Sequence, residues 1–256
     1  MQSFLFQLLN SYFNKIFVLT IARATERHAF IKEHLEGLDF EFFWGIDKKD
    51  LTIDTLIKDN IYNSEKARQI HRYDREMTAG QIACSWGHAK IYEEIVKNGY
   101  KSVLILEDDV TANFDALQDF PQIMSELPQD WELVYFDYHK REASTLNTKM
   151  QELFYHLRHI SGSLKWNHTM INHLHAKDYS THLNKAGFHE FTSAYALTQN
   201  AAAKLLALQK PIAFVADNLL AYAVTNKIIK AFITVPRLFE QQSQQIGGRS
   251  ISYVDE

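Results

Sequence analysis

Three consecutive carboxylates, Glu107, Asp108 and Asp109, follow the short apolar run 103–106. Adjacent carboxylates repel one another, so their proximity is unfavourable unless a cation or hydrogen-bond donors compensate. Hard divalent ions such as Mn²⁺ and Mg²⁺ prefer carboxylate oxygens and keep open positions for phosphate oxygens. The triplet therefore predicts a metal site suited to a nucleotide diphosphate leaving group. A solvated acidic turn that caps a helix is the simpler alternative.

A fourth carboxylate, Asp217, follows the apolar run 212–216, which we interpret as a strand. A carboxylate at such a strand end is a candidate general base. Aspartate is also a favoured N-cap, so capping of a helix over 218–224 is an equal alternative. Glu132 and Asp137 flank another predicted strand and are reserve candidates for the same role.

Two arginines and a histidine are candidates for ligand contacts. Arg23 and Arg27 lie four residues apart after the first predicted strand, where guanidinium groups can reach phosphate oxygens, although surface helices also carry such pairs. Arg27 is the stronger candidate. His88 lies one helical turn after Cys84, and it is either a ligand contact or a packed structural histidine. Cys84 is predicted to be a small buried residue without chemistry, because no partner base is evident.

These residues need a scaffold that brings strand ends together. Short β-branched or aromatic runs alternate with segments of helical periodicity. The predicted strands are 15–21, 40–44, 102–106, 132–136 and 192–197, and the predicted helices are 27–35, 81–98 and 201–209. The alternation predicts an α/β fold with a mainly parallel sheet and helices on both faces, in which ligands bind beyond the carboxyl ends of the strands.

The composition is that of one folded domain spanning residues 1–256. Hydrophobic residues make up 46% of the chain, enough for a substantial core. The net charge of −4 supplies no basic field, so nucleic acid is not expected as a partner. With Cys84 as the single cysteine, no intramolecular disulfide can form, which favours a reducing compartment such as the cytoplasm.

The first residues, 1–13, are apolar and amphipathic but lack a basic leader and an obvious cleavage site. We expect this segment to stay attached and to pack onto the domain. Peripheral contact with a membrane surface is the lesser alternative. The sequence contains no uninterrupted run of about 18 apolar residues, which a membrane-spanning helix would require.

Four parts of the chain carry recognisable motifs. Residues 20–27 fit Asn-Leu-x-Arg-x-x-x-Arg at both arginines, with Thr20 in place of the asparagine. Residues 80–88 fit Gly-Glu-x-Gly-Cys-x-x-Ser-His at Gly80, Cys84 and His88, and depart from it at Gln81, Ala83 and Gly87. The segment 104–109 is similar to an acid-x-acid motif, and 192–197 followed by 201–206 is similar to a closing strand and helix. Together they resemble glycosyltransferase family 25, the lipopolysaccharide and collagen glucosyl- and galactosyltransferases of the GT-A fold.

The resemblance implies a GT-A-like fold and transfer of a hexose, galactose or glucose, from a UDP-sugar donor to a glycan or glycolipid acceptor, with inversion at the anomeric carbon. It also implies a role in lipopolysaccharide or other surface polysaccharide synthesis, where the acceptor would lie at the inner membrane surface. Mn²⁺ or Mg²⁺ would be bound by Glu107 and Asp109. The implied donor-binding residues are Thr20, Arg27, His88, Glu107 and Asp108. Inversion requires a catalytic base, and Asp217 is our candidate for it.

Residues 139–190 form a long, weakly periodic stretch, and seven of the twelve histidines lie within 156–189. We expect an irregular excursion from the core that binds the acceptor. The His173-x-His175 pair suggests zinc, but there is no second pair at standard ligand spacing.

Two other functions fit part of the pattern. Residues 107–111 nearly match the Asp-x-Asp-x-Thr motif of haloacid dehalogenase-type phosphatases and phosphotransferases, but that chemistry needs an aspartate nucleophile where this chain has Glu107. A noncatalytic carbohydrate-binding module fits the 13% aromatic content but leaves the acidic strand end unexplained.

Overall fold

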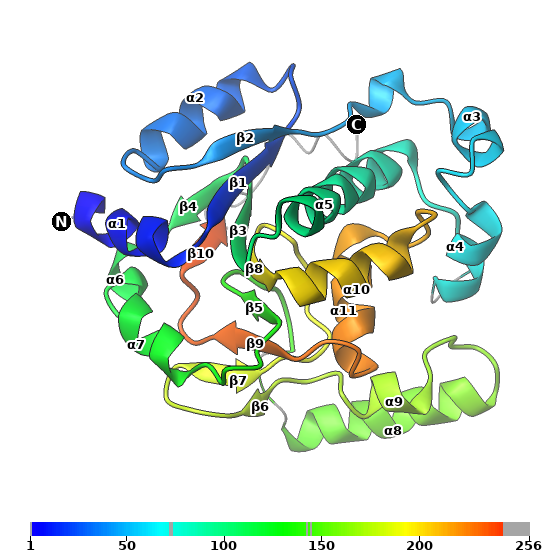
Figure 1. Ribbon diagram of the computed structural model, residues 1–256. Coiled ribbons are helices and arrows are strands. Elements are labelled where there is room, and N and C mark those ends of the chain that lie inside the picture. The colour runs from blue at the N-terminus through cyan, green and yellow to red at the C-terminus, as the bar shows by residue number, and fades with distance from the viewer. Residues whose placement is uncertain (1, 72–73, 142, 144, 243–256) are drawn as a thin grey trace.

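The computed structural model describes residues 2–71, 74–141, 143 and 145–242, which form an α/β fold around an eight-stranded sheet of order β2-β1-β3-β8-β5-β9-β7-β6 (Figure 1). Six of these strands point the same way, while β7 and β8 run in the opposite direction. The prediction of a mainly parallel sheet is confirmed. The strands are β1 (Lys15–Thr20), β2 (Glu41–Trp44), β3 (Ser102–Glu107), β5 (Leu133–Tyr135), β6 (Lys177–Asp178), β7 (Leu183–Lys185), β8 (Ala194–Thr198) and β9 (Ala231–Thr234).

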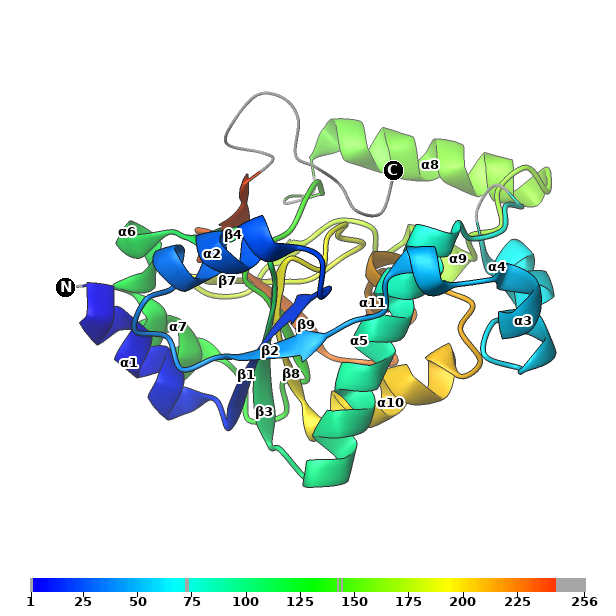
Figure 2. The same cartoon turned by 90° about the horizontal axis from the view of Figure 1, so that it is seen from above.

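Helices cover both faces of the sheet, as predicted (Figure 2). One face carries α5 (Ala79–Asn98), α10 (Gln199–Gln209) and α11 (Ala216–Thr225), and the other carries α1 (Gln2–Tyr12), α2 (Thr25–His34), α6 (Phe114–Leu117) and α7 (Phe120–Glu126). Side chains of β3 alternate between these layers: Val103 and Ile105 pack on the first face, and Leu104 and Leu106 on the second. All four are buried, which is why β3 is a continuous apolar run in the sequence.

The predicted helix 81–98 is α5, and local hydrogen bonds fix its start. Thr78 Oγ1 accepts from the Gln81 backbone N–H at 3.2 Å, and Gln81 Oε1 accepts from the Thr78 backbone N–H at 3.0 Å, which together form a capping box. Further along, Gly87 faces β1, where an added Cβ would lie only 3.1 Å from Leu19 Cδ1. Gly87 therefore allows α5 to pack closely against the carboxyl end of β1.

The predicted strand over 212–216 is wrong. Only Ile212 makes a strand-like bridge, to Tyr62, and the segment runs directly into α11. The Gln209 side chain takes the place of a neighbouring strand, because it donates to the Phe214 carbonyl at 2.8 Å and accepts from the Phe214 backbone N–H at 3.1 Å. A short apolar run predicts burial but does not by itself distinguish a strand from a buried connection.

The prediction of irregular structure over 139–190 is also wrong, because this stretch contains α8 (Leu146–Ile160), α9 (His168–Ile171) and the edge strands β6 and β7. The large apolar side chains of α8 are exposed: Leu146, Met150, Leu153, Phe154, Leu157 and Ile160. They recur at helical spacing, so the sequence contained the signal, but the weakly periodic flanking residues obscured it.

A small separate core anchors this stretch to the domain. Trp166, Ile171, Leu174 and Phe188 are buried together and pack against Ala221 of α11. The residues that follow α8 in sequence are therefore fixed next to α11.

The N-terminal segment packs onto the domain as predicted, with Leu5, Phe6 and Leu9 of α1 buried and Phe4 exposed. Within the described ranges, none of the helices has the length and apolar character needed to cross a membrane. The connection from β2 to α5 contains the 3-10 helix η1 (Lys48–Asp50), α3 (Ile53–Lys58) and α4 (Ser64–Ile70).

Candidate active site

The acidic triplet lies where β3 leaves the sheet. Glu107 is the last residue of β3, and Asp108 and Asp109 form the turn into β4 (Val110–Ala112). β4 pairs in antiparallel fashion with β10 (Phe239–Gln241), so the triplet is fixed between the main sheet and a small second one.

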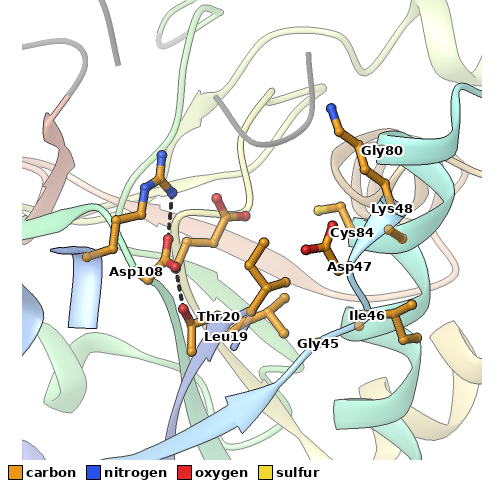
Figure 3. A pocket seen from close by; sticks show the side chains of 14 residues that line it. Leu19, Thr20, Gly45, Ile46, Asp47, Lys48, Gly80, Cys84 and Asp108 are labelled. Carbon is orange, nitrogen blue, oxygen red and sulfur yellow. Dashed lines mark hydrogen bonds and ion pairs between the residues drawn. The ribbon is translucent and has the colours of Figure 1, made fainter. Parts of the chain in front are cut away.

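Asp108 is stabilised by donors from the first motif of the sequence. Thr20 Oγ1 donates to Asp108 Oδ2, and Arg27 Nη1 donates to Asp108 Oδ1 at 2.6 Å (Figure 3). Both Thr20 and Asp108 are buried. The structure thus brings together three of the predicted donor-binding residues, and the Arg27 guanidinium offsets part of the charge of the triplet.

Asp109 faces the other side of the turn. Its Oδ2 accepts from Gln241 Nε2 at 3.0 Å and lies 3.5 Å from Arg27 Nη2, whereas its buried Oδ1 has no hydrogen-bond partner among the described residues. Burial, with the Glu107 charge adding to it, raises the pKa of Asp109 to about 7. A buried carboxylate oxygen that lacks a hydrogen-bond partner is suited to a bound cation, which would also favour the ionised form of Asp109.

Glu107 is held by a different set of groups. Thr192 Oγ1 donates to Glu107 Oε1, and His88 Nε2 lies 3.4 Å from the same oxygen. Burial alone would raise the pKa of Glu107, but His88, Thr192 and Arg27 outweigh it and lower the pKa below its usual value. Glu107 is therefore ionised at neutral pH.

His88 is buried beneath this carboxylate. Its Nδ1 is 2.7 Å from the Tyr195 hydroxyl, which in turn is 3.1 Å from the Tyr92 hydroxyl. The sequence motifs assigned no role to either tyrosine, although Tyr195 lies within the predicted strand 192–197. Neighbouring Cys84 is half-buried, and burial raises the pKa of its thiol well above the usual value, with Glu107 and Asp217 adding to the effect.

The first pocket opens beside the acidic triplet, between β1, the end of β3 and the first half of α5 (Figure 3). The loop after β2 forms another part of its wall. This loop was not predicted to take part, although it carries Asp47, which forms an ion pair with Arg23. The lining residues are Leu19, Thr20, Ile21, Arg27, Gly45, Ile46, Asp47, Lys48, Gly80, Ala83, Cys84, Gly87, Glu107 and Asp108.

Asp217 lies in the first turn of α11, so neither predicted position is right: it follows no strand, and the N-cap is Val215. Its Oδ1 accepts from the Asn218 backbone N–H at 2.6 Å. Burial, with the Glu190 and Glu107 charges adding to it, raises the pKa of Asp217 to about 6.

Asp217 lines a second pocket, which is built from α4, α11 and the stretch before β8. Its walls are largely apolar and aromatic, with Trp166, Phe188 and Phe214 beside the polar groups Glu190 and Asn218. The expected excursion therefore contributes a wall of the pocket that contains the candidate base.

The family model described as "Glycosyltransferase family 25 (LPS biosynthesis protein)" matches residues 13–220. The chain belongs to glycosyltransferase family 25. The match confirms the resemblance inferred from the motifs, and the α/β sheet with helices on both faces is consistent with the GT-A-like fold expected of this family.

Curated relatives carry family 25 names. An Anopheles gambiae "Glycosyltransferase 25 family member" is 28% identical over 201 residues, which cover 75% of this chain and 28% of the relative. Human "Procollagen galactosyltransferase 2" is 25% identical over 128 residues, 48% of this chain and 20% of that protein. A Bos taurus relative, 24% identical over 77% of this chain and 29% of its own length, is named "Probable inactive glycosyltransferase 25 family member 3". Each match thus covers less than a third of the relative's length.

Two of the three departures from this family 25 motif, Gln81 and Gly87, have structural explanations. Gln81, in place of glutamate, still accepts the Thr78 backbone N–H in the capping box. Gly87 provides the close contact with Leu19 described above, so a larger residue there would require the Leu19 side chain to shift.

The reserve carboxylates have separate partners in this family 25 chain. Glu132 bonds to Lys204 and to the Lys230 backbone N–H at the start of β5, away from both pockets. Asp137, by contrast, is fully buried just beyond β5 and accepts from Ser193 Oγ; burial raises its pKa to about 6.

The histidine pair considered for zinc is divided between two partners. His173 Nδ1 bonds to the Thr169 carbonyl at 2.7 Å, whereas His175 Nδ1 pairs with Glu152 at 2.8 Å. Within the part of the chain that the structure describes, the one group of three potential ligands is elsewhere, at Cys84, His88 and Glu107.

Proposed function

We propose that this chain is a metal-dependent, inverting hexosyltransferase that moves galactose or glucose from a UDP-sugar to a glycan or glycolipid acceptor. Family membership and the relatives named galactosyltransferases support the reaction class. The observation that carries the proposal is the placement of the two pockets. Glu107 lines one and Asp217 the other, and they lie close enough for the charge of Glu107 to raise the pKa of Asp217.

The first pocket is the proposed donor site. The lining of this pocket suits a nucleotide diphosphate. Arg27 and Lys48 supply positive charge for phosphate groups, and the glycine-containing loop allows the backbone to approach them closely. Glu107 and Asp109 are the proposed ligands of Mn²⁺ or Mg²⁺. Glu107 lines the first pocket, whereas Asp109 lies just behind its lining, and the buried, unpartnered Oδ1 of Asp109 supports that role. When bound, the ion would offset negative charge on the departing diphosphate.

Asp217 is the proposed base. Inversion needs a base on the side of the sugar opposite the leaving group, and Asp217 lies in the neighbouring pocket rather than in the donor pocket itself. With a pKa of about 6, its carboxylate is mostly ionised at neutral pH and can accept the proton of the acceptor hydroxyl.

The second pocket is the proposed acceptor site. Aromatic side chains such as Trp166 and Phe188 provide flat apolar surfaces for sugar rings, and Glu190 and Asn218 can hydrogen-bond to hydroxyl groups. We extend the proposal to an acceptor of lipopolysaccharide or another surface polysaccharide, modified in the cytoplasm at the inner membrane surface.

The test is a screen of nucleotide sugars with the purified chain, followed by UDP release in Mn²⁺ or in EDTA. We expect release with UDP-galactose or UDP-glucose, dependent on the metal and accelerated by a glycan acceptor. No release with any donor would favour a noncatalytic binding protein, and release of inorganic phosphate instead of UDP would favour the phosphatase alternative.

A further inference from the structure

Cys84, His88 and Glu107 meet at the wall of the first pocket, and their potential ligand atoms all lie within 4.8 Å of one another. Cys84 and His88 are four residues apart on α5, so their side chains project from the same face of the helix. Glu107 approaches from the end of β3. We propose that these three residues bind a soft divalent cation, of which Zn²⁺ is the best match, at a site that shares Glu107 with the donor-site metal proposed above.

The distance between the His88 and Glu107 ligand atoms fits a tetrahedral metal. At bond lengths of about 2.0–2.1 Å from zinc, nitrogen and oxygen ligands lie about 3.4 Å apart in a tetrahedron. His88 Nε2 and Glu107 Oε1 are separated by 3.4 Å. Cys84 and Glu107 both line the first pocket, so a fourth position of the metal would face that pocket.

His88 has a nitrogen available for the metal. Its side chain is 1% exposed, and its Nε2 pairs with Glu107 Oε1 at 3.4 Å without making a well-formed hydrogen bond to any described residue. A buried nitrogen with only this long contact is incompletely satisfied, and a metal between the two atoms would satisfy both. Its other nitrogen, Nδ1, bonds to the Tyr195 hydroxyl, which is the arrangement that fixes the ring and its tautomer in histidine metal sites.

Charge and ligand type favour zinc over the ions proposed for the donor site. A thiolate, a carboxylate and a neutral imidazole together balance the two positive charges of the metal, which suits a buried position. Thiolate and imidazole are softer ligands that suit Zn²⁺, whereas Mn²⁺ and Mg²⁺ prefer oxygen ligands. The metal displaces the thiol proton on binding, and that proton leaves to solvent.

Cobalt(II) provides a direct probe, because a thiolate bound to Co²⁺ gives a near-ultraviolet charge-transfer band. Cys84 is the single cysteine of the chain, so such a band reports this residue alone. We expect the metal-free protein to develop the band with one equivalent of Co²⁺. Zn²⁺ should abolish it, and an excess of Mg²⁺ should leave it unchanged.

Variants separate a three-ligand site from a lone reactive thiol. Glu107→Gln and His88→Asn should each weaken Co²⁺ binding by about 10-fold or more, and Tyr195→Phe, which retains all three ligands, should weaken it less. Circular dichroism of each metal-free variant checks the fold, and Glu107→Asp replaces any variant that fails to fold. His168→Ala, which removes the surface pair His156–His168, is the matched control and should leave the band unchanged.

Absence of the charge-transfer band in wild type would overturn the proposal, whether or not Co²⁺ binds elsewhere. Equal Co²⁺ affinity in wild type and in the folded Glu107 and His88 variants would overturn it too, because the thiolate would then bind without them. The experiment uses neither sugar donor nor acceptor, so its failure is distinct from failure of the proposed transferase function.

Discussion

The first and second pockets differ in how their carboxylates are stabilised. In the first, side chains from distant parts of the chain surround the acids: Thr20 and Arg27 bond to Asp108, and Thr192 bonds to Glu107. In the second, Asp217 accepts from the Asn218 backbone N–H in the first turn of α11, bonds to the Phe191 backbone before β8, and is otherwise set among largely apolar and aromatic walls.

This difference predicts which substitutions affect donor binding and which affect the transfer reaction. A network of charged side chains is specific for a charged ligand, and losing one member leaves the others uncompensated. A carboxylate stabilised mainly by backbone groups can be neutralised without disturbing such a network. We therefore expect substitutions in the first pocket to affect donor binding and substitutions in the second to affect transfer.

The largest effect is expected for Asp217→Asn. Loss of the proposed base should lower the transfer rate by about 100-fold or more and leave UDP affinity nearly unchanged. Because the pKa of Asp217 is about 6, wild-type transfer should rise as pH increases through 6 and fall below it, and the variant should lack this dependence.

Asp119→Asn, at an exposed surface position, is the control for Asp217→Asn. Loss of UDP binding in Asp217→Asn would move Asp217 to the donor site. Normal transfer would move the search for the base to Asp137, whose pKa is also about 6.

A smaller effect is expected on the stability of the fold, through His189, which lies between the second-pocket residues Phe188 and Glu190. His189 is buried; its Nε2 accepts from the Gly187 backbone N–H, so its Nδ1 donates to the Lys140 carbonyl. Burial, aided by Arg141, lowers its pKa from 6.5 to about 4.

His189 takes up a proton near pH 6.5 in the unfolded chain but only near pH 4 in the folded chain. The free energy of unfolding therefore has its full value above pH 6.5 and decreases as the pH falls from 6.5 towards 4. Chemical denaturation should show a loss of about 2 kcal/mol between pH 8 and pH 5. His189→Gln should reduce this dependence, and exposed His34→Asn should not. An unchanged dependence in His189→Gln would assign it to other groups.

A milder change in the second pocket tests its separation from the first. Asn218→Ala removes an amide that we expect to bond an acceptor hydroxyl, and it should raise the acceptor KM by about 3- to 10-fold. Donor hydrolysis without acceptor should stay at the wild-type rate. An equal loss in both assays would indicate that the two pockets do not act separately.

The smallest effect is expected on the exposed face of α8. Leu153→Ser and Leu157→Ser should each change the free energy of unfolding by less than about 0.5 kcal/mol, because both side chains already contact solvent. Leu174→Ala, in the small buried core nearby, should cost about 2 to 5 kcal/mol. A large loss in either α8 variant would mean that this face is covered in solution.

The first pocket was predictable because its residues occur in short motifs at strand ends. Residues 20–27 and 104–109 include the carboxyl ends of adjacent parallel strands, β1 and β3, so side chains from both segments meet at one edge of the sheet. The partner of His88 was not predictable, since Tyr195 reaches it through the antiparallel register that pairs Ile105 with Tyr195.

The second pocket was largely beyond prediction. Trp166 and Phe188 belong to the small core that links α9 to α11, whereas Phe214 belongs to the main core, and only the folded chain brings these rings together at one pocket. The position of Asp217 was wrong for a local reason, because the bonds between Gln209 and Phe214 replace the strand that the apolar run suggested. Its candidacy as base rested on that predicted strand end and on the base that an inverting reaction requires, and it stays a prediction.

The central claim is that the acidic strand end binds a metal and a nucleotide together. Calorimetric titration of UDP into wild type and Asp109→Asn, each with Mn²⁺ and with EDTA, tests it most directly, with Asp119→Asn as the matched control. We expect Mn²⁺ to strengthen UDP binding to wild type and to the control, and Asp109→Asn to weaken Mn²⁺-dependent binding by about 10-fold or more. UDP affinity that is independent of Mn²⁺ in wild type, or unchanged in Asp109→Asn, would contradict the account.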